Sequence, residues 1–175
     1  MKTTNNYYAT STLLFLLTAI SVATSSCKKN SDATPAIDAM ATGFTYKADG
    51  GATVTVDSAN AVLYTPAFAG AMRTMDVYAF KGGKQVLEFH FAPATGAKAV
   101  GGTFGTGGTF LTYITAMPIQ SYDSQSGSLN LTTCDTVGNK IIGDFNFVAK
   151  EYPYTGTTTH SITEGHMSVT KLSKQ

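Results

Sequence analysis

From residue 43 to the C-terminus, apolar and polar residues alternate in short runs that end at glycine, asparagine or aspartate. The clearest run is KIIGDFNFVAK at residues 140–150, where apolar residues and glycine take every second position. Because successive side chains of a strand point to opposite faces, this alternation is typical of strands with one buried face. No run beyond residue 43 repeats its apolar residues at the helical period of about 3.6. The pattern predicts antiparallel β-structure.

Turn signals divide this region into individual strands. Glycine turns at residues 48–51 and 81–83 join the predicted strand pairs 44–47 with 53–57 and 75–80 with 84–91. Further strands are expected at 61–65, 110–115, 127–134, 140–150 and 158–172, and Gly165 indicates a bulge in the last of them. The total of about nine or ten strands predicts an all-β, antiparallel β-sandwich, with a flattened or closed, lipocalin-like β-barrel as the alternative.

The first 26 residues have the composition of an export signal. Lys2 precedes the apolar run LLFLLTAISVA at residues 13–23, and three small residues then lead to Cys27. The run is too short to span a bilayer as a stable helix. Small residues between an apolar run and a cysteine resemble a lipobox, whose cysteine becomes the acylated N-terminus, carrying fatty acids such as palmitate. The alternative is an ordinary secreted protein cut near Ala23.

These signals predict three segments. We expect a lipoprotein signal peptide at residues 1–26, the lipidated Cys27 with a flexible tether at 27–42, and a single antiparallel β-domain at 43–175. Residue 28 is lysine and not the aspartate of the best-known inner-membrane retention signal, which favours the outer membrane, with the domain facing the periplasm or the cell surface.

The charge balance limits the classes of partner. The chain has 12 basic and 11 acidic residues and a net charge of +1. This balance predicts no electrostatic footprint for nucleic acid and no polybasic patch for anionic membranes. The expected partners are the membrane, through the lipid anchor, and an unidentified envelope or extracellular ligand.

Several short motifs together resemble a known family. They are GSLNLT at residues 127–132, a D-x-x-G-N-K turn at 135–140, IGDFNF at 142–147, ITEG at 162–165, and an opening F-x-Y-x-x-D-G hairpin at 44–50. The set resembles small Bacteroidota-type lipoproteins with a β-rich domain of unknown function, over most of residues 43–172. The resemblance implies an envelope lipoprotein and no particular activity, because that family has no assigned catalytic residues.

His160, Glu164 and His166 form the sharpest candidate site, because their spacing places all three on one face of a regular strand. Such a face could hold zinc or nickel, with His90 and Glu88 added from another strand. Residues six apart on a strand lie roughly 20 Å from each other, so only a bulge at Gly165 would bring Glu164 and His166 together. We therefore expect solvent-facing side chains here.

Other candidate residues have a structural interpretation that we prefer. Tyr122, Tyr152 and Tyr154 lie in expected loops, where they would form a binding rim or cap the end of the fold. Cys134 lies beside Asp135 at a strand end, a poor setting for a reactive thiolate. The glycine-rich run at 101–108 lacks the Lys-Ser/Thr ending of a P-loop.

No catalytic motif is present. A G-x-S-x-G elbow is absent, Asp135 and Asn139 provide too few oxygens for calcium, and paired acids are possible only if the fold gathers Asp76, Glu88 or Asp144. The sequence therefore predicts a non-enzymatic binding module without a cofactor.

Two alternatives to a surface-binding module stay open. One is a barrel that carries an apolar small molecule in a cavity lined by residues such as Phe89, Phe145 and Phe147. The other, from a different class, is a metal-assisted hydrolase.

Overall fold

The computed structural model describes residues 43–66, 70–101, 108–153 and 156–175. Cys27, the tether, Tyr154 and most of the glycine-rich run lie outside these residues. The regular structure of the described part consists of strands alone, which confirms the all-β prediction. This part contains no helix long and apolar enough to cross a membrane.

Eleven strands form one sheet. Their bounds are β1 Thr45–Ala48, β2 Val54–Thr55, β3 Ser58–Tyr64, β4 Thr74–Lys81, β5 Lys84–Phe91, β6 Gly96–Val100, β7 Phe110–Ala116, β8 Ile119–Asp135, β9 Lys140–Glu151, β10 Thr159–Val169 and β11 Leu172–Lys174. The order across the sheet is β11-β3-β4-β5-β7-β8-β9-β10-β1-β2, and β6 pairs with the second half of β8. All pairs are antiparallel except β11 with β3.

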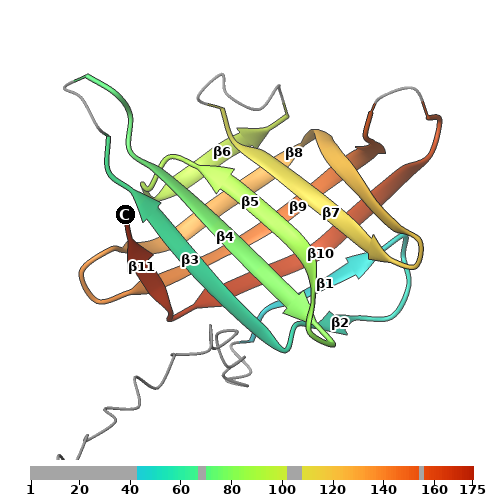
Figure 1. Ribbon diagram of the computed structural model, residues 1–175, viewed down its shortest axis with the longest axis horizontal. Helices are drawn as coiled ribbons and strands as arrows, with labels where there is room; N and C mark the ends of the chain where they lie inside the picture. The colour runs from blue at the N-terminus through green and yellow to red at the C-terminus, as the bar shows by residue number, and fades with distance from the viewer. Residues whose placement is uncertain (1–42, 67–69, 102–107, 154–155) are drawn as a thin grey trace, which may run out of the picture. The chain divides into compact units, whose positions relative to one another are not determined.

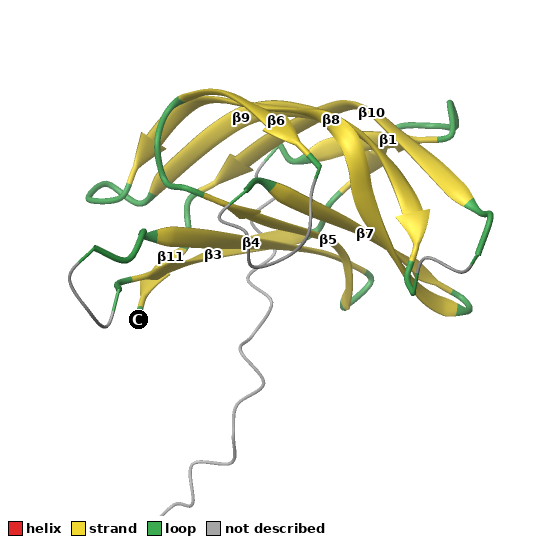
Figure 2. Cartoon of the chain, turned by 90° about the horizontal axis from the view of Figure 1, so that it is seen from above, coloured by secondary structure: helices red, strands yellow, loops and turns green. Residues whose placement is uncertain are grey.

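The sheet is open and strongly curled, so it has the form of a half-barrel (Figure 1). Seen from above, β3, β4, β5, β7 and β11 form one layer, and β1, β6, β8, β9 and β10 lie over it (Figure 2). The 17-residue strand β8 has register shifts between Ser124 and Ser126 and between Leu131 and Thr133. Such bulges bend a strand and increase its twist, which lets one sheet supply both layers.

Aromatic side chains fill the space between the layers. The Phe89 and Phe145 rings meet edge to face at 4.9 Å between centroids, and Phe44 lies 5.7 Å from Phe89 and 5.8 Å from Phe145. Phe147 packs beside Phe145 at 6.4 Å. All four rings are buried, so the predicted apolar faces of β5 and β9 do form the core. A barrel that carries an apolar molecule would need a cavity lined by Phe89, Phe145 and Phe147, but these rings pack against one another.

Three features of the chain differ from the sequence-based prediction. β6 was not predicted, and its sequence, Gly-Ala-Lys-Ala-Val, has no strong strand signal. β8 begins eight residues earlier than expected. Its first half was missed because it is polar and lacks an apolar alternation. It includes the fully buried Ser124, whose hydroxyl accepts a hydrogen bond from the Leu111 N–H at 3.0 Å. The expected last strand is two strands, since the chain leaves β10 after Val169 and pairs with β3 as β11.

The predicted bulge in β10 is present. The register with β9 shifts between Ile162 and Gly165, and Glu164 has a left-handed backbone with a φ of 49°. A Cβ at position 165 would overlap the ring of Phe145. Glycine is therefore required here by close approach to the core and not by its own backbone angles.

Gly165→Ala should destabilise the domain by about 1–3 kcal/mol, because the new methyl group must displace the buried Phe145 ring. Urea unfolding followed by circular dichroism measures this loss. A double-mutant cycle with Phe145→Leu provides the control, since a smaller side chain should relieve part of the overlap. Strictly additive losses, or a Gly165→Ala variant as stable as the natural protein, would contradict this close contact.

Candidate functional site

A shallow groove of about 350 Å³ lies on the outer face of β8, β9 and β10. Its lining is mainly polar and consists of Ser128, Asn130, Asp144, Phe145, Asn146, Glu164, Gly165 and His166. The volume lies within the range of small-molecule sites, although the groove is open to solvent. It combines a hollow with several converging hydrogen-bonding groups.

The strand registers explain why these side chains meet. Asp144 is paired with Asn130 of β8 and with His166 of β10, and Asn146 is paired with Ser128. Directly paired residues of antiparallel strands point to the same face, so these side chains form two neighbouring rows. The bulge adds Glu164 to the edge of the same face, and Gly165 contributes backbone to the lining of the groove.

Both acidic side chains of the groove have a basic residue as a neighbour. His166 Nδ1 lies 2.8 Å from Asp144 Oδ1, and Lys47 Nζ lies 2.7 Å from Glu164 Oε2. The Asn146 amide donates a hydrogen bond to the Ser128 hydroxyl at 2.9 Å. These exposed pairs contribute little to stability. They do fix the side chains in position.

The bulge separates the three proposed metal ligands. His166 and Glu164 line the groove, but His160 is paired with the buried Ala149 and lies on the inner face, with its Nδ1 2.6 Å from Asp49 Oδ2. The expectation that His160, Glu164 and His166 share one face is therefore wrong, because one extra residue inverts the alternation. Over the described residues, no group of three or more His, Cys, Asp or Glu side chains is arranged to hold a metal ion.

His160 lies in a cluster of tyrosines at the end of the sheet. Its ring meets Tyr122 edge to face at 4.3 Å and Tyr113 at 5.2 Å. Burial raises the pKa of Asp49, but hydrogen bonds from His160 and from the Ser161 N–H together lower it below its usual value.

The three tyrosines proposed as a rim have different positions. Tyr122 is buried in this cluster and belongs to a β-strand, so its predicted place in a loop is wrong. Tyr152 is 54% exposed, and Tyr154 lies outside the described residues. The structure therefore does not show a rim that includes all three.

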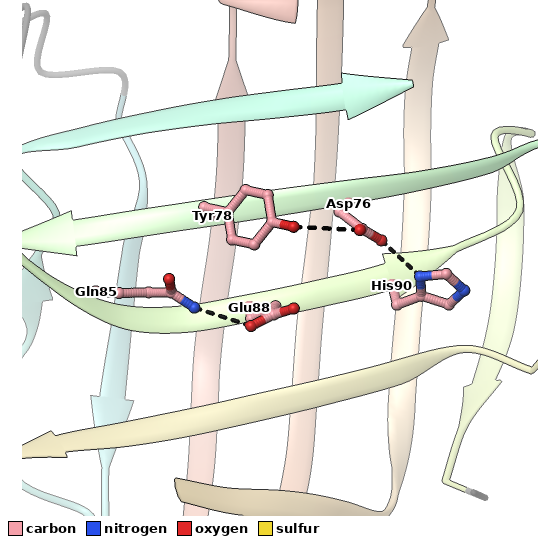
Figure 3. A network of polar contacts seen from close by, with 5 residues as sticks. All are labelled: Asp76, Tyr78, Gln85, Glu88 and His90. Atoms are coloured by element: carbon pink, nitrogen blue, oxygen red, sulfur yellow. Dashed lines mark hydrogen bonds and ion pairs between the residues drawn. The ribbon is translucent and has the colours of Figure 1, made fainter. Parts of the chain in front are cut away.

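A second polar network lies on the outer face of β4 and β5 (Figure 3). Asp76 accepts a hydrogen bond from the Tyr78 hydroxyl at 3.2 Å, and its other oxygen lies 2.5 Å from His90 Nδ1. Glu88 accepts a hydrogen bond from the Gln85 amide at 2.9 Å. The fold thus brings Asp76 and Glu88, two of the acids considered for a paired site, onto adjacent strands.

This network is partly withdrawn from water. The Asp76 and His90 side chains are only 13% and 16% exposed. Burial has the largest effect on the pKa of Glu88 and raises it, and the negative charges of Asp76 and Asp123 raise it further. The hydrogen bond from Gln85 and the electrostatic interaction with His90 lower this pKa, but the net shift is upward. Burial and the charge of Asp76 also raise the pKa of Tyr78. Because the contact of His90 with Asp76 joins β5 to β4 and the groove described above lies on other strands, we assign the network a structural role.

The turn residues have structural roles as well. Asp135 accepts hydrogen bonds from the N–H groups of Val137 and Gly138 at 2.9 and 2.8 Å, as expected for a turn-stabilising aspartate. Cys134 packs against the core, and burial raises the pKa of its thiol. A raised pKa disfavours the reactive thiolate.

Sequence reasoning missed Ser128, Asn130 and Asn146 as members of a site. Their signal was present, because they occupy alternate positions in predicted strands, opposite the apolar core face. The missing information was the register, which decides which outward side chains become neighbours.

Comparison of the chain with protein-family models, with curated proteins and with solved structures finds no match. The resemblance to small Bacteroidota-type lipoproteins therefore stays a prediction from sequence motifs. The site has to be interpreted from its own geometry.

Glu88→Gln should stabilise the domain at pH 7 and lose this advantage near pH 4. The raised pKa of Glu88 means that the folded state favours the protonated form, so its ionisation destabilises the fold as the pH rises above about 4.3. Glutamine carries no charge and still accepts the hydrogen bond from Gln85. Urea unfolding at both pH values tests this.

The matched control for Glu88→Gln is Glu164→Gln, whose exposed ion pair with Lys47 should be worth less than about 1 kcal/mol. A Glu88→Gln variant that is less stable at pH 7, or equally affected at both pH values, would show that ionised Glu88 is not destabilising.

Proposed function

We propose that the protein is a lipid-anchored envelope protein whose β-domain binds a neutral, hydroxyl-rich ligand, such as the saccharide part of a glycan. The observation that supports this most is the groove on β8, β9 and β10, where hydroxyl, amide, carboxylate and imidazole groups converge on one hollow. The function is binding and not catalysis.

The chemistry of the groove favours a ligand without charge. Asp144 and Glu164 are each paired with a basic side chain, so an ion entering the groove would have to compete with these pairs. The Ser128, Asn130 and Asn146 side chains provide both donors and acceptors. A ligand with many hydroxyl groups can use both kinds of group, because each hydroxyl both donates and accepts.

The alternatives have less support from the geometry. A carrier of an apolar molecule needs an interior cavity, but the Phe89, Phe145 and Phe147 rings contact one another in the core. A metal-assisted hydrolase would need a ligand set, and His160 has a different face and partner from His166. Recognition at the surface requires neither feature.

The proposed anchor would hold the groove near the membrane. Between the lipidated Cys27 and Gly43 the tether has about 16 residues, which span at most roughly 55 Å when fully extended. A groove on such a tether samples ligands close to the membrane at a high effective concentration. Weak binding to an open groove would then suffice for capture.

Cys27→Ala should release the protein from the membrane fraction of the native host, because the acyl chains would have no attachment site. Fractionation followed by immunoblotting measures this, and Cys134→Ala is the matched control that should stay in the membrane. A Cys27→Ala variant that still sediments with membranes, or an unacylated mature N-terminus by mass spectrometry, would refute the anchor.

Asn146→Ala should weaken saccharide binding by roughly 2- to 10-fold, since it removes one hydrogen bond worth about 0.5–1.5 kcal/mol. Calorimetric titration with a panel of neutral di- and trisaccharides measures the affinity.

Asn60→Ala, on β3 outside the groove, is the matched control and should bind like the natural protein. No binding of any sugar by the natural protein, or an equal loss in both variants, would refute saccharide binding in the groove.

A further inference from the structure

Basic side chains gather at one end of the sheet, although the whole chain is almost neutral. Lys140 is paired with Asp135 across the β8–β9 turn, and Lys174 is paired with Leu63 of β3, whose partner on β4, Met75, lies two residues after Arg73. Arg73 and Lys98 also interact electrostatically with Cys134, and Lys174 does so with Asp135. Figure 1 shows the β8–β9 turn, the C-terminus and the start of β4 together at the left of the view. The net charge of the whole chain therefore does not reveal this local grouping of basic residues.

Asp135 is the acidic side chain of the β8–β9 turn, and it already accepts hydrogen bonds from two backbone N–H groups of its own turn. The expectation that the protein has no polybasic patch considered only the summed charge and not the positions of the charged residues.

Two exposed apolar side chains stand among the cations. Met72 is 65% exposed beside Arg73, and Val137 is 85% exposed at the tip of the β8–β9 turn. We call Met72, Arg73, Lys98, Val137, Lys140 and Lys174 the basic end. Basic residues next to exposed apolar residues are typical of surfaces that rest on anionic lipid, where the cations meet head groups and the apolar side chains enter the interface.

The opposite end of the sheet has exposed apolar side chains among mixed charges. Met117 and Ile119 are exposed there at 84% and 75%, and the described ionisable side chains nearby include the acidic Asp49 and Glu151 as well as the basic Lys150. An anionic surface would repel these carboxylates. Charge complementarity therefore selects the basic end.

We infer that the basic end docks on the anionic lipid surface of the membrane that holds the anchor. This inference rests on the proposed lipidation of Cys27, because the tether supplies the high local concentration that makes a weak docking surface effective. It is independent of the ligand in the groove. Docking by this end leaves the groove on the side of the domain and accessible to solvent.

Tryptophan fluorescence tests the docking directly, because the natural chain contains no tryptophan. Full-length lipidated protein with Val137→Trp is reconstituted into vesicles of phosphatidylcholine, with or without phosphatidylglycerol, whose acyl chains are brominated. Emission should fall at least twofold in the anionic vesicles and change little in the neutral ones. Met117→Trp at the opposite end is the matched control and should keep its emission in both.

Charge reversal then tests the cause. Lys140→Glu and Lys174→Glu together, in the Val137→Trp protein, should abolish the quenching while the urea midpoint shows that the domain is folded. The docking surface would be overturned if the charge-reversed protein were still quenched, or if quenching were equal in neutral vesicles. It would also be overturned if Met117→Trp were quenched in place of Val137→Trp, or if protein that floats with the vesicles showed no quenching. Protein that does not float at all would overturn the lipid anchor, so the two failures are distinguishable.

Discussion

The ring of Phe145 occupies the space that a side chain at position 165 would need, and much of the domain depends on that contact. On its inner side, Phe145 packs against Phe44 and Phe89 and so joins the two layers of the curled sheet. Phe145 and Gly165 also belong to the lining of the groove on the outer face of β8, β9 and β10. The paired residues Phe145 and Gly165 therefore connect the core with the floor of the groove.

The bulge also decides which polar side chains can act together. Without it, the alternation in β10 would place His160 on the same face as Glu164 and His166. With one extra residue, His160 joins the buried tyrosines and Asp49, whereas His166 pairs with Asp144 on the surface. Each of the three histidines accordingly has its own aspartate partner, with Asp76 serving His90. The geometry favours fixed hydrogen-bonding surfaces over a shared metal centre.

Local sequence signals predicted the strands with clear alternation, the glycine hairpins and the bulge at Gly165. They were less informative where tertiary contacts override local pattern: Ser124 is polar but fully buried, and β6 is a strand only because β8 provides a partner. The groove needed the register of three strands, which sequence alone left undefined. The basic end was not predicted for a similar reason, because the net charge of a chain does not say where its charged residues lie in the fold.

The most direct test of the account is to map the bound saccharide by the amide NMR shifts of the full mature chain. We predict that shifts on titration concentrate on Ser128, Asn130, Asp144, Asn146 and residues 164–166, which share the groove. The β4–β5 network and the tyrosine cluster around His160 should change little. Shifts centred on either of those regions, or no shift with any neutral sugar, would contradict the proposal that the bulge builds a saccharide-binding groove.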